Sequence, residues 1–220
     1  MISKKERLSE VAYEHIKAMI LDLEFKPGEH IAEEKISELL NCSRTPIREA
    51  LHRLSNDNLV QLTPQKSARV SIFSNKDIQE IGIVRLSQDM LSARLAIHYG
   101  SLAGYLSLNP IIEKCEAAHK SNNLRDRVKS DMEFHMHITK IGGNEHLIKH
   151  QENLFHQVYL IQYQLAEQIG FENTETQIFQ HRDMLKALMD HDIAKACNFI
   201  SSHLRDFYML DPSFISQFET

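Results

Sequence analysis

Glycine, proline, cysteine and tryptophan are scarce in this chain: its 220 residues include 7 glycines, 5 prolines, 3 cysteines and no tryptophan. Glycine and proline fall well below the roughly 7% and 5% of an average protein. This scarcity disfavours turn-rich β-sandwiches and barrels and favours long helices with few breaks. The cysteines are far apart and form no CxxC pair. A disulfide framework or a cysteine zinc site is therefore not expected, and a reducing cytoplasm fits best.

Long hydrophobic runs are also missing. No apolar run approaches the roughly 18 residues needed to span a bilayer, and the charged start at residues 1–7 is not followed by the apolar segment of a signal peptide. With 42% hydrophobic and 25% charged residues, the composition is that of a folded soluble chain. We expect a cytoplasmic protein with no membrane partner.

Positive charge is concentrated in one short segment. The chain carries a formal net charge of -5, yet residues 44–75 hold five basic and only two acidic side chains. A basic island in an acidic chain often meets phosphate. A solvated basic face explains the same charges equally well at this point.

Hydrophobic periodicity predicts a mainly α chain with two domains, 1–74 and 75–220. In the first, helices are predicted over 6–23, 33–40 and from Ser43 to about Asn56, followed by strands over 59–63 and 68–73. The second is predicted to be an antiparallel bundle of six helices, at 76–106, 110–121, 124–141, 144–169, 174–190 and 192–209.

Two short helices, a tight turn and a β-ribbon are typical of a winged helix-turn-helix, in which the later helix enters the major groove of DNA. The third predicted helix has an apolar arc, with Ile47, Ala50, Leu51 and Leu54. Its opposite arc carries arginines, a hydroxyl and an amide, the groups that reach guanine edges and phosphates. A solvated helix face is the alternative.

The residues themselves resemble the GntR family of bacterial transcriptional regulators. The family patterns PGxxL, SRTPVREAL and GLV are matched at Pro27–Ile31, Ser43–Leu51 and Asn58–Val60. The nine residues of the second match differ from the pattern only by isoleucine for valine. The resemblance implies that operator DNA is contacted by the wing loop and by Arg44, Thr45, Arg48 and Arg53. To these expected DNA-binding residues we add Lys35 and, in the wing loop, Lys66.

Two positions depart from the family pattern. Ser67 stands where the wing usually has glycine, so the wing tip is expected to turn differently. Glu34 stands where many members carry a basic residue, and a carboxylate does not read guanine as arginine does. Lys35 is expected to substitute for that residue, or the operator differs at the corresponding base.

Histidines gather in the second domain, where four residues have metal-ligand types and compatible spacing. Asp131 and His135 lie one helical turn apart. His181 and His203 lie at nearly the same level of two helices that we expect to run antiparallel. Three imidazoles and one carboxylate suit zinc, nickel, manganese or iron. With ten histidines from His98 onward, coincidence is the competing explanation.

The same segments resemble the FCD effector domain of the FadR-like GntR subfamily. The DxxFH…GN signature is matched by Asp131, Phe134, His135 and Gly143-Asn144, and the H…A…D…A…H pattern runs from His181 to His203. The resemblance implies one divalent transition metal per chain, bound by Asp131, His135, His181 and His203, with zinc as the first choice. Six helices indicate the shorter, VanR-like form.

Arg85 and Asn144 are the expected ligand-binding residues. Family members place an arginine at the position of Arg85 and a glutamate four residues later, where this chain has Asp89. The resemblance implies that Arg85 pairs with the carboxylate of a small organic acid beside the metal. A surface ion pair between Arg85 and Asp89 is the alternative.

We expect a homodimeric DNA-binding transcriptional regulator that binds a palindromic operator and responds to a carboxylate effector. A metal-dependent enzyme acting on a small carboxylate is the alternative, but it needs a positioned acid or base, and no such residue stands at motif spacing. A zinc-stabilised adaptor is a third possibility. The chain is therefore not expected to be an enzyme.

Overall fold

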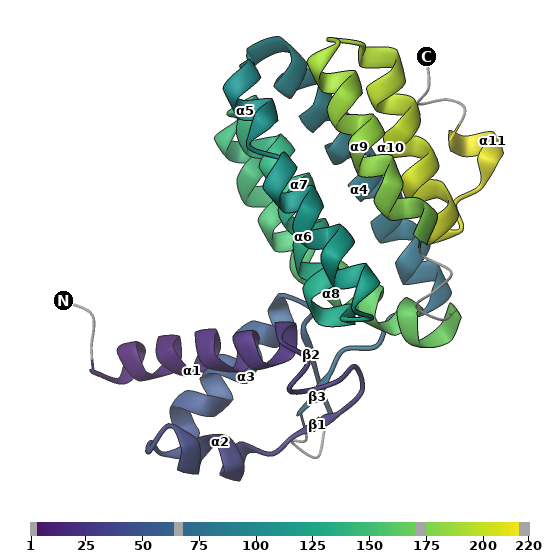
Figure 1. The fold of residues 1–220 in the computed structure, drawn as a ribbon. Helices are drawn as coiled ribbons and strands as arrows, with labels where there is room; N and C mark the ends of the chain where they lie inside the picture. The colour runs from purple at the N-terminus through teal and green to yellow at the C-terminus, as the bar shows by residue number, and fades with distance from the viewer. Residues whose placement is uncertain (1–3, 64–67, 170–174, 216–220) are drawn as a thin grey trace. The chain divides into compact units, whose positions relative to one another are not determined.

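The computed structural model describes residues 4–63, 68–169 and 175–215. The chain forms two compact units, Met1–Ile72 and Phe73–Thr220, so the division falls two residues before the boundary expected from the sequence. Helices dominate (Figure 1), and the prediction of a mainly α fold is confirmed. In the part of the chain that is described, no helix has the length and apolar character that crossing a membrane requires.

The first unit combines helices with a small antiparallel sheet. Its elements are α1 (Lys4–Leu21), β1 (His30–Ile31), α2 (Glu33–Leu39), α3 (Arg44–Asn56), β2 (Val60–Leu62) and β3 (Ala68–Val70). The strand order is β1-β3-β2. β3 lies in the middle and pairs with both neighbours, so that Val70 faces Val60 and Ala68 faces Ile31.

The apolar faces of α1 and α3 pack together and form the core of this unit. Ile16, Ile47 and Leu54 are completely buried. α3 ends as the sequence predicts, because Asn58 adopts a positive φ of 57°, a conformation that asparagine tolerates better than most residues. Ser43 occupies the N-cap position with extended backbone, but its hydroxyl makes no capping hydrogen bond.

Strand β1 was not predicted from the sequence. Two residues are too few to show an alternating pattern, and the strand exists because β3 offers a free edge to it. Gly28, with φ of 78°, supports this pairing by donating its backbone N–H to the carbonyl of Val70.

The second unit is a bundle of helices. They are α4 (Asn75–Tyr99), α5 (Leu102–Leu106), α6 (Asn109–Lys120), α7 (Leu124–Gly142), α8 (Glu145–Ile169), α9 (Glu175–Met189), α10 (Ile193–Tyr208) and α11 (Pro212–Ile215). α7 packs against α4, α6 and α8, and α10 packs against α4 and α9. Figure 1 shows the long helices of this unit side by side. Side chains that point inward from α4, α7, α9 and α10 therefore meet.

The predicted helix over 76–106 is wrong, because the chain breaks at Gly100. This residue has extended backbone with ψ of 167°, and a Cβ there would lie 2.3 Å from the carbonyl oxygen of Ala96. Ser101 then caps a new helix, α5, by accepting a hydrogen bond from the N–H of Gly104. The short helices α5 and α11 thus add to the six that were predicted.

Gly82 permits a close approach between α4 and α10. A Cβ at this position would lie 2.6 Å from the ring of Tyr208, a distance shorter than real contacts allow. The missing side chain lets the Tyr208 ring lie directly against α4, one turn before Arg85.

Candidate functional site

The outward face of α3 carries the predicted DNA-reading residues. Arg44, Thr45 and Arg48 are exposed, whereas the apolar arc that includes Ile47 and Leu51 is buried. The amphipathic division of this helix is therefore as predicted. DNA contact by these residues and by exposed Lys35 stays a prediction, and Lys66 lies outside the described residues.

Two of these arginines form ion pairs with glutamates of α2. Arg44 Nη2 lies 2.6 Å from Glu34 Oε1, and Arg48 Nε lies 2.8 Å from Glu33 Oε2. Because Arg44 and Glu34 are both more than half exposed, their pair is weak in water. Any DNA contact predicted for Arg44 and Arg48 must therefore compete with these carboxylates for the guanidinium groups.

Arg53 is engaged by α1. Its guanidinium lies 2.6 Å from Glu10 Oε2 and 4.2 Å from the ring centroid of Tyr13, whose hydroxyl donates to Asp57. Burial and the Asp57 carboxylate raise the pKa of Tyr13. These contacts give Arg53 a role in joining α1 to α3, and its predicted DNA contact must compete with them.

The four predicted metal ligands form one buried cluster. Asp131 and His135 come from α7, His181 comes from α9 and His203 from α10. Each is at most 4% exposed, and their ligand atoms all lie within 4.8 Å of one another. The helical spacing and the antiparallel α9–α10 pair predicted from the sequence bring these residues together.

The distances fit a common centre. Oδ1 of Asp131 lies 3.1 Å from His181 Nε2, 3.7 Å from His203 Nε2 and 4.0 Å from His135 Nε2. Ligand atoms about 2.0–2.2 Å from one metal ion lie roughly 3–3.5 Å apart. Neither ring nitrogen of His181 makes a well-directed hydrogen bond within the described residues. A buried ring nitrogen without such a bond is unfavourable unless its lone pair is donated to another partner, such as a metal ion. The residues therefore fit a metal.

The protonation states also suit metal binding, which requires an ionised carboxylate and neutral imidazoles. Burial opposes ionisation of Asp131, but the three surrounding imidazoles lower the pKa of its carboxyl group well below the ordinary value. Burial lowers the pKa of His181 and, together with the neighbouring imidazoles, holds that of His203 well below its ordinary value. Asp131 is therefore a carboxylate at neutral pH, and His181 and His203 are neutral rings.

Further side chains orient these ligands. Gln162 Nε2 donates to Asp131 Oδ2 at 2.6 Å, and Gln180 Oε1 lies 3.1 Å from His203 Nδ1. His135 Nδ1 lies 3.0 Å from a carboxylate oxygen of Asp89. Such partners fix ring orientation and tautomer in metal sites. Sequence reasoning did not assign the two glutamines. Gln162 lies on α8, which carries none of the ligands, and Gln180 directly precedes His181 on α9, a spacing that belongs to no metal-site motif.

Arg85 lies beside the cluster, and the surface ion pair considered as its alternative is wrong. Its side chain is 1% exposed. Nε lies 3.3 Å from Asp89 Oδ2, and Nη1 donates to the Tyr208 hydroxyl at 3.0 Å. Nη2 lies 3.8 Å from Asp131 Oδ2 and makes no hydrogen bond within the described residues. A cation with a spare donor at this depth is suited to an anionic ligand.

Asn144 lies elsewhere in the unit. It is exposed, and its side-chain oxygen accepts from the N–H of Leu147 at the start of α8. The structure thus gives it a helix-capping contact outside the buried cluster. Among the other histidines of this unit, His146 and His150 are exposed, and His137 Nε2 lies 2.7 Å from the Ser107 hydroxyl.

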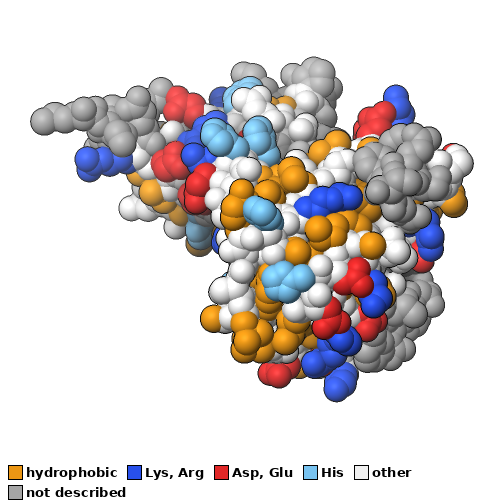
Figure 2. Space-filling view, turned by 90° about the horizontal axis from the view of Figure 1, so that it is seen from above, with side chains coloured by type: hydrophobic (Ala, Val, Ile, Leu, Met, Phe, Trp, Pro, Cys, Tyr) orange, Lys and Arg blue, Asp and Glu red, His pale blue; other side chains and the backbone are white. Residues whose placement is uncertain are grey.

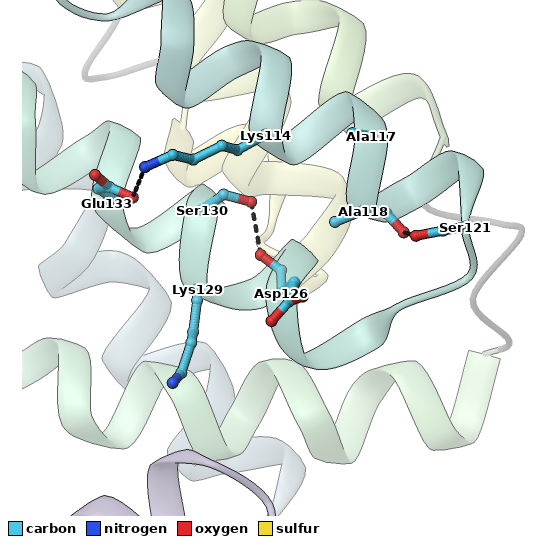
Figure 3. Close-up of a pocket in the computed structure, with 8 residues that line it drawn as sticks. All are labelled: Lys114, Ala117, Ala118, Ser121, Asp126, Lys129, Ser130 and Glu133. Atoms are coloured by element: carbon cyan, nitrogen blue, oxygen red, sulfur yellow. Dashed lines mark hydrogen bonds and ion pairs between the residues drawn. The ribbon is translucent and has the colours of Figure 1, made fainter.

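A cavity of ≈ 540 Å³ is lined by residues at α6 and α7, and none of the four cluster residues is among them. Figure 3 shows its lining residues, Lys114, Ala117, Ala118, Ser121, Asp126, Lys129, Ser130 and Glu133. Lys114 pairs with Glu133, and the Ser121 and Ser130 hydroxyls donate to backbone carbonyls. These polar groups of the cavity therefore already have partners within the protein.

Comparison with known proteins identifies the class. Residues 8–70 match the bacterial regulatory proteins of the gntR family, and residues 81–206 match the FCD domain. The chain therefore belongs to the gntR family of bacterial transcriptional regulators and carries an FCD domain. The match confirms the resemblance drawn from the sequence.

Particular relatives are regulators of similar length. The chain is 26% identical over 195 residues to the uncharacterized HTH-type transcriptional regulator YdhC of Bacillus subtilis (strain 168), covering 87% of this chain and 85% of that one. It is 27% identical over 219 residues to the HTH-type transcriptional repressor NanR of Enterobacter sp. (strain 638), covering 91% and 84%.

Solved structures share the fold. E. coli McbR/YncC has a TM-score of 0.79 at 20% identity, with 100% of both chains covered. A GntR regulator of Rhodococcus sp. RHA1 has a TM-score of 0.81 at 18% identity, covering 96% of this chain and 98% of that one.

Proposed function

We propose that this transcriptional regulator changes its operator affinity when a small organic acid binds at Arg85, beside a divalent metal held by Asp131, His135, His181 and His203. The observation that carries the proposal is the buried convergence of three imidazoles, one carboxylate and the spare donor of Arg85. A bound metal would supply a Lewis-acidic partner for a carboxylate oxygen. Arg85 Nη2 would supply a charged hydrogen bond to the same ligand.

The metal part of the proposal is tested by measuring the metal content of the purified protein. Three nitrogens and one oxygen suit zinc first, with nickel, manganese or iron as alternatives. Elemental analysis of protein purified without chelator is expected to give one metal per chain. His203→Ala is expected to lower that content, and His146→Ala, at an exposed histidine, is the matched control. Equal loss in both variants would contradict the assignment.

The effector part is tested by thermal shift with a panel of small carboxylic acids. A ligand that binds only the folded state stabilises it by mass action. An acid that raises the Tm of wild type is expected to have no effect on Arg85→Gln. Multiple turnover of any acid in the panel would instead support the enzyme alternative.

The DNA part concerns the outward face of α3. We infer that Arg44, Thr45 and Arg48 contact the operator, assisted by Lys35, Lys66 and Arg53. Arg48→Ala is expected to weaken specific binding in a mobility-shift titration by roughly 5- to 150-fold, because an arginine–guanine pair contributes about 1–3 kcal/mol. Arg94→Ala, at an exposed arginine of the other unit, is the control.

A homodimer on a palindromic operator fits this function, because two recognition helices related by a two-fold axis read two half-sites. Val84 and Leu91 lie seven residues apart on α4 and are 47% and 45% exposed. Hydrophobic side chains also lie in groups on the face drawn in Figure 2. Leu91→Glu is expected to shift sedimentation from dimer to monomer if α4 lies at the dimer interface.

A further inference from the structure

Asp89 is a buried carboxylate that joins the two halves of the ligand site. It lies on α4, one turn after Arg85, and its side chain is 2% exposed. Oδ2 lies 3.0 Å from His135 Nδ1 and 3.3 Å from Arg85 Nε. Oδ1 accepts from the side-chain amide of Gln151. Both carboxylate oxygens are therefore occupied by donors from three different helices.

The contact of Asp89 with His135 selects one tautomer of the His135 imidazole. A carboxylate oxygen 3.0 Å from Nδ1 favours a proton there over a lone pair, so the neutral imidazole is expected to carry its proton on Nδ1. The lone pair then lies on Nε2, which is the nitrogen 3.3 Å from His203 Nε2 and within the ligand cluster. Asp89 thus presents His135 to a metal in the only tautomer that can bind it through Nε2.

Its contact with Arg85 orients the anion-binding donor. Nε is held by Asp89 and Nη1 by the Tyr208 hydroxyl. Because the guanidinium is planar and rigid, fixing these two nitrogens also fixes the direction of Nη2, which lies 3.8 Å from Asp131 Oδ2. The spare donor is thereby directed toward the metal-ligand cluster.

We propose that Asp89 is a positioning residue that couples metal binding to anion binding, through one carboxylate oxygen shared by His135 and Arg85. Metal binding at His135 and anion binding at Arg85 each require the Asp89 carboxylate in the same place. When one ligand is bound, Asp89 is already ordered, so the second ligand loses less free energy in ordering it. Such coupling is reciprocal: each ligand raises the affinity for the other by the same factor. The inference rests on the proposed metal and effector site.

The test measures zinc affinity by competition with a chromophoric chelator, with and without acetate as the anion probe. Acetate is suitable because it is a simple carboxylate that binds zinc weakly in solution. In wild type, acetate is expected to raise zinc affinity. In Asp89→Asn, zinc affinity is expected to fall 10- to 100-fold, and the effect of acetate is expected to disappear. Asp89→Glu keeps a carboxylate and is expected to restore part of the coupling.

Asp190→Asn is the matched control, because Asp190 forms an exposed ion pair with Lys186. Coupling retained in Asp89→Asn at the wild-type level would overturn the inference. Wild type that binds neither zinc nor acetate would instead contradict the proposed effector site, so the two failures are distinguishable.

A second measurement needs no variant of Asp89. In ¹⁵N NMR spectra of metal-free wild type, the His135 ring is expected to be protonated on Nδ1, with the signal assigned from its loss in His135→Gln. A ring protonated on Nε2 would overturn the proposed role of Asp89, even if Asp89→Asn does not fold.

Discussion

Replacing Glu34 by glutamine is expected to tighten DNA binding, although the substitution removes an ion pair from the protein. Glu34 Oε1 lies 2.6 Å from Arg44 Nη2, and the two side chains are 71% and 54% exposed. To contact DNA as proposed, Arg44 must leave this partner. The carboxylate that stays behind then lies near the phosphates and repels them.

The magnitude follows from these two costs. An exposed ion pair contributes about 0–1 kcal/mol. Repulsion between the carboxylate and a phosphate about 7 Å away is roughly 0.6 kcal/mol in water, and salt screens part of it. Together they amount to about 0.5–1.5 kcal/mol, which corresponds to roughly 2- to 10-fold tighter binding.

Fluorescence anisotropy measures the change in DNA affinity. The titrations use a random duplex and the upstream fragment of the regulator's own gene, each over a series of salt concentrations. Glu38→Gln is the matched control, because Glu38 is an exposed carboxylate on the same helix. The gain from Glu34→Gln should be absent in an Arg44→Ala background. Weaker binding by Glu34→Gln, or an equal gain from Glu38→Gln, would refute the reasoning.

Three further predictions concern stability. Burial lowers the pKa values of His181 and His203. As the pH falls, the unfolded chain therefore takes up protons that the folded chain does not. Urea titrations with EDTA should show the free energy of unfolding falling below about pH 6.5, by on the order of 1 kcal/mol per pH unit for each histidine. Gly82→Ala should lower the free energy of unfolding by about 1–3 kcal/mol, because the new Cβ would lie 2.6 Å from the Tyr208 ring. An unchanged urea midpoint would contradict this close contact. Tyr208→Phe should lower the free energy of unfolding by about 1–3 kcal/mol, because it removes the hydroxyl that accepts a hydrogen bond from buried Arg85. Thermal unfolding measures this loss against Tyr99→Phe, which alters an exposed tyrosine.

The sequence predicts most helices because each buries a face that repeats with the helical period. It also predicts the amphipathic division of α3 and the convergence of Asp131, His135, His181 and His203, since the last two lie at matching heights on consecutive antiparallel helices. These features depend on spacing along the chain, and spacing can be read from the residues alone.

Only the tertiary structure decides which distant groups meet. It brings β1 to the edge of β3, ends α4 at Gly100 and turns Arg53 toward α1. It also buries the Arg85–Asp89 pair, because packing of α4 against α7 and α10 encloses both side chains. The same four-residue spacing occurs on exposed helices as well. The sequence determined which residues face one another along α4, and the packing of neighbouring helices determined that they lie beside Asp131 and His135 rather than in water.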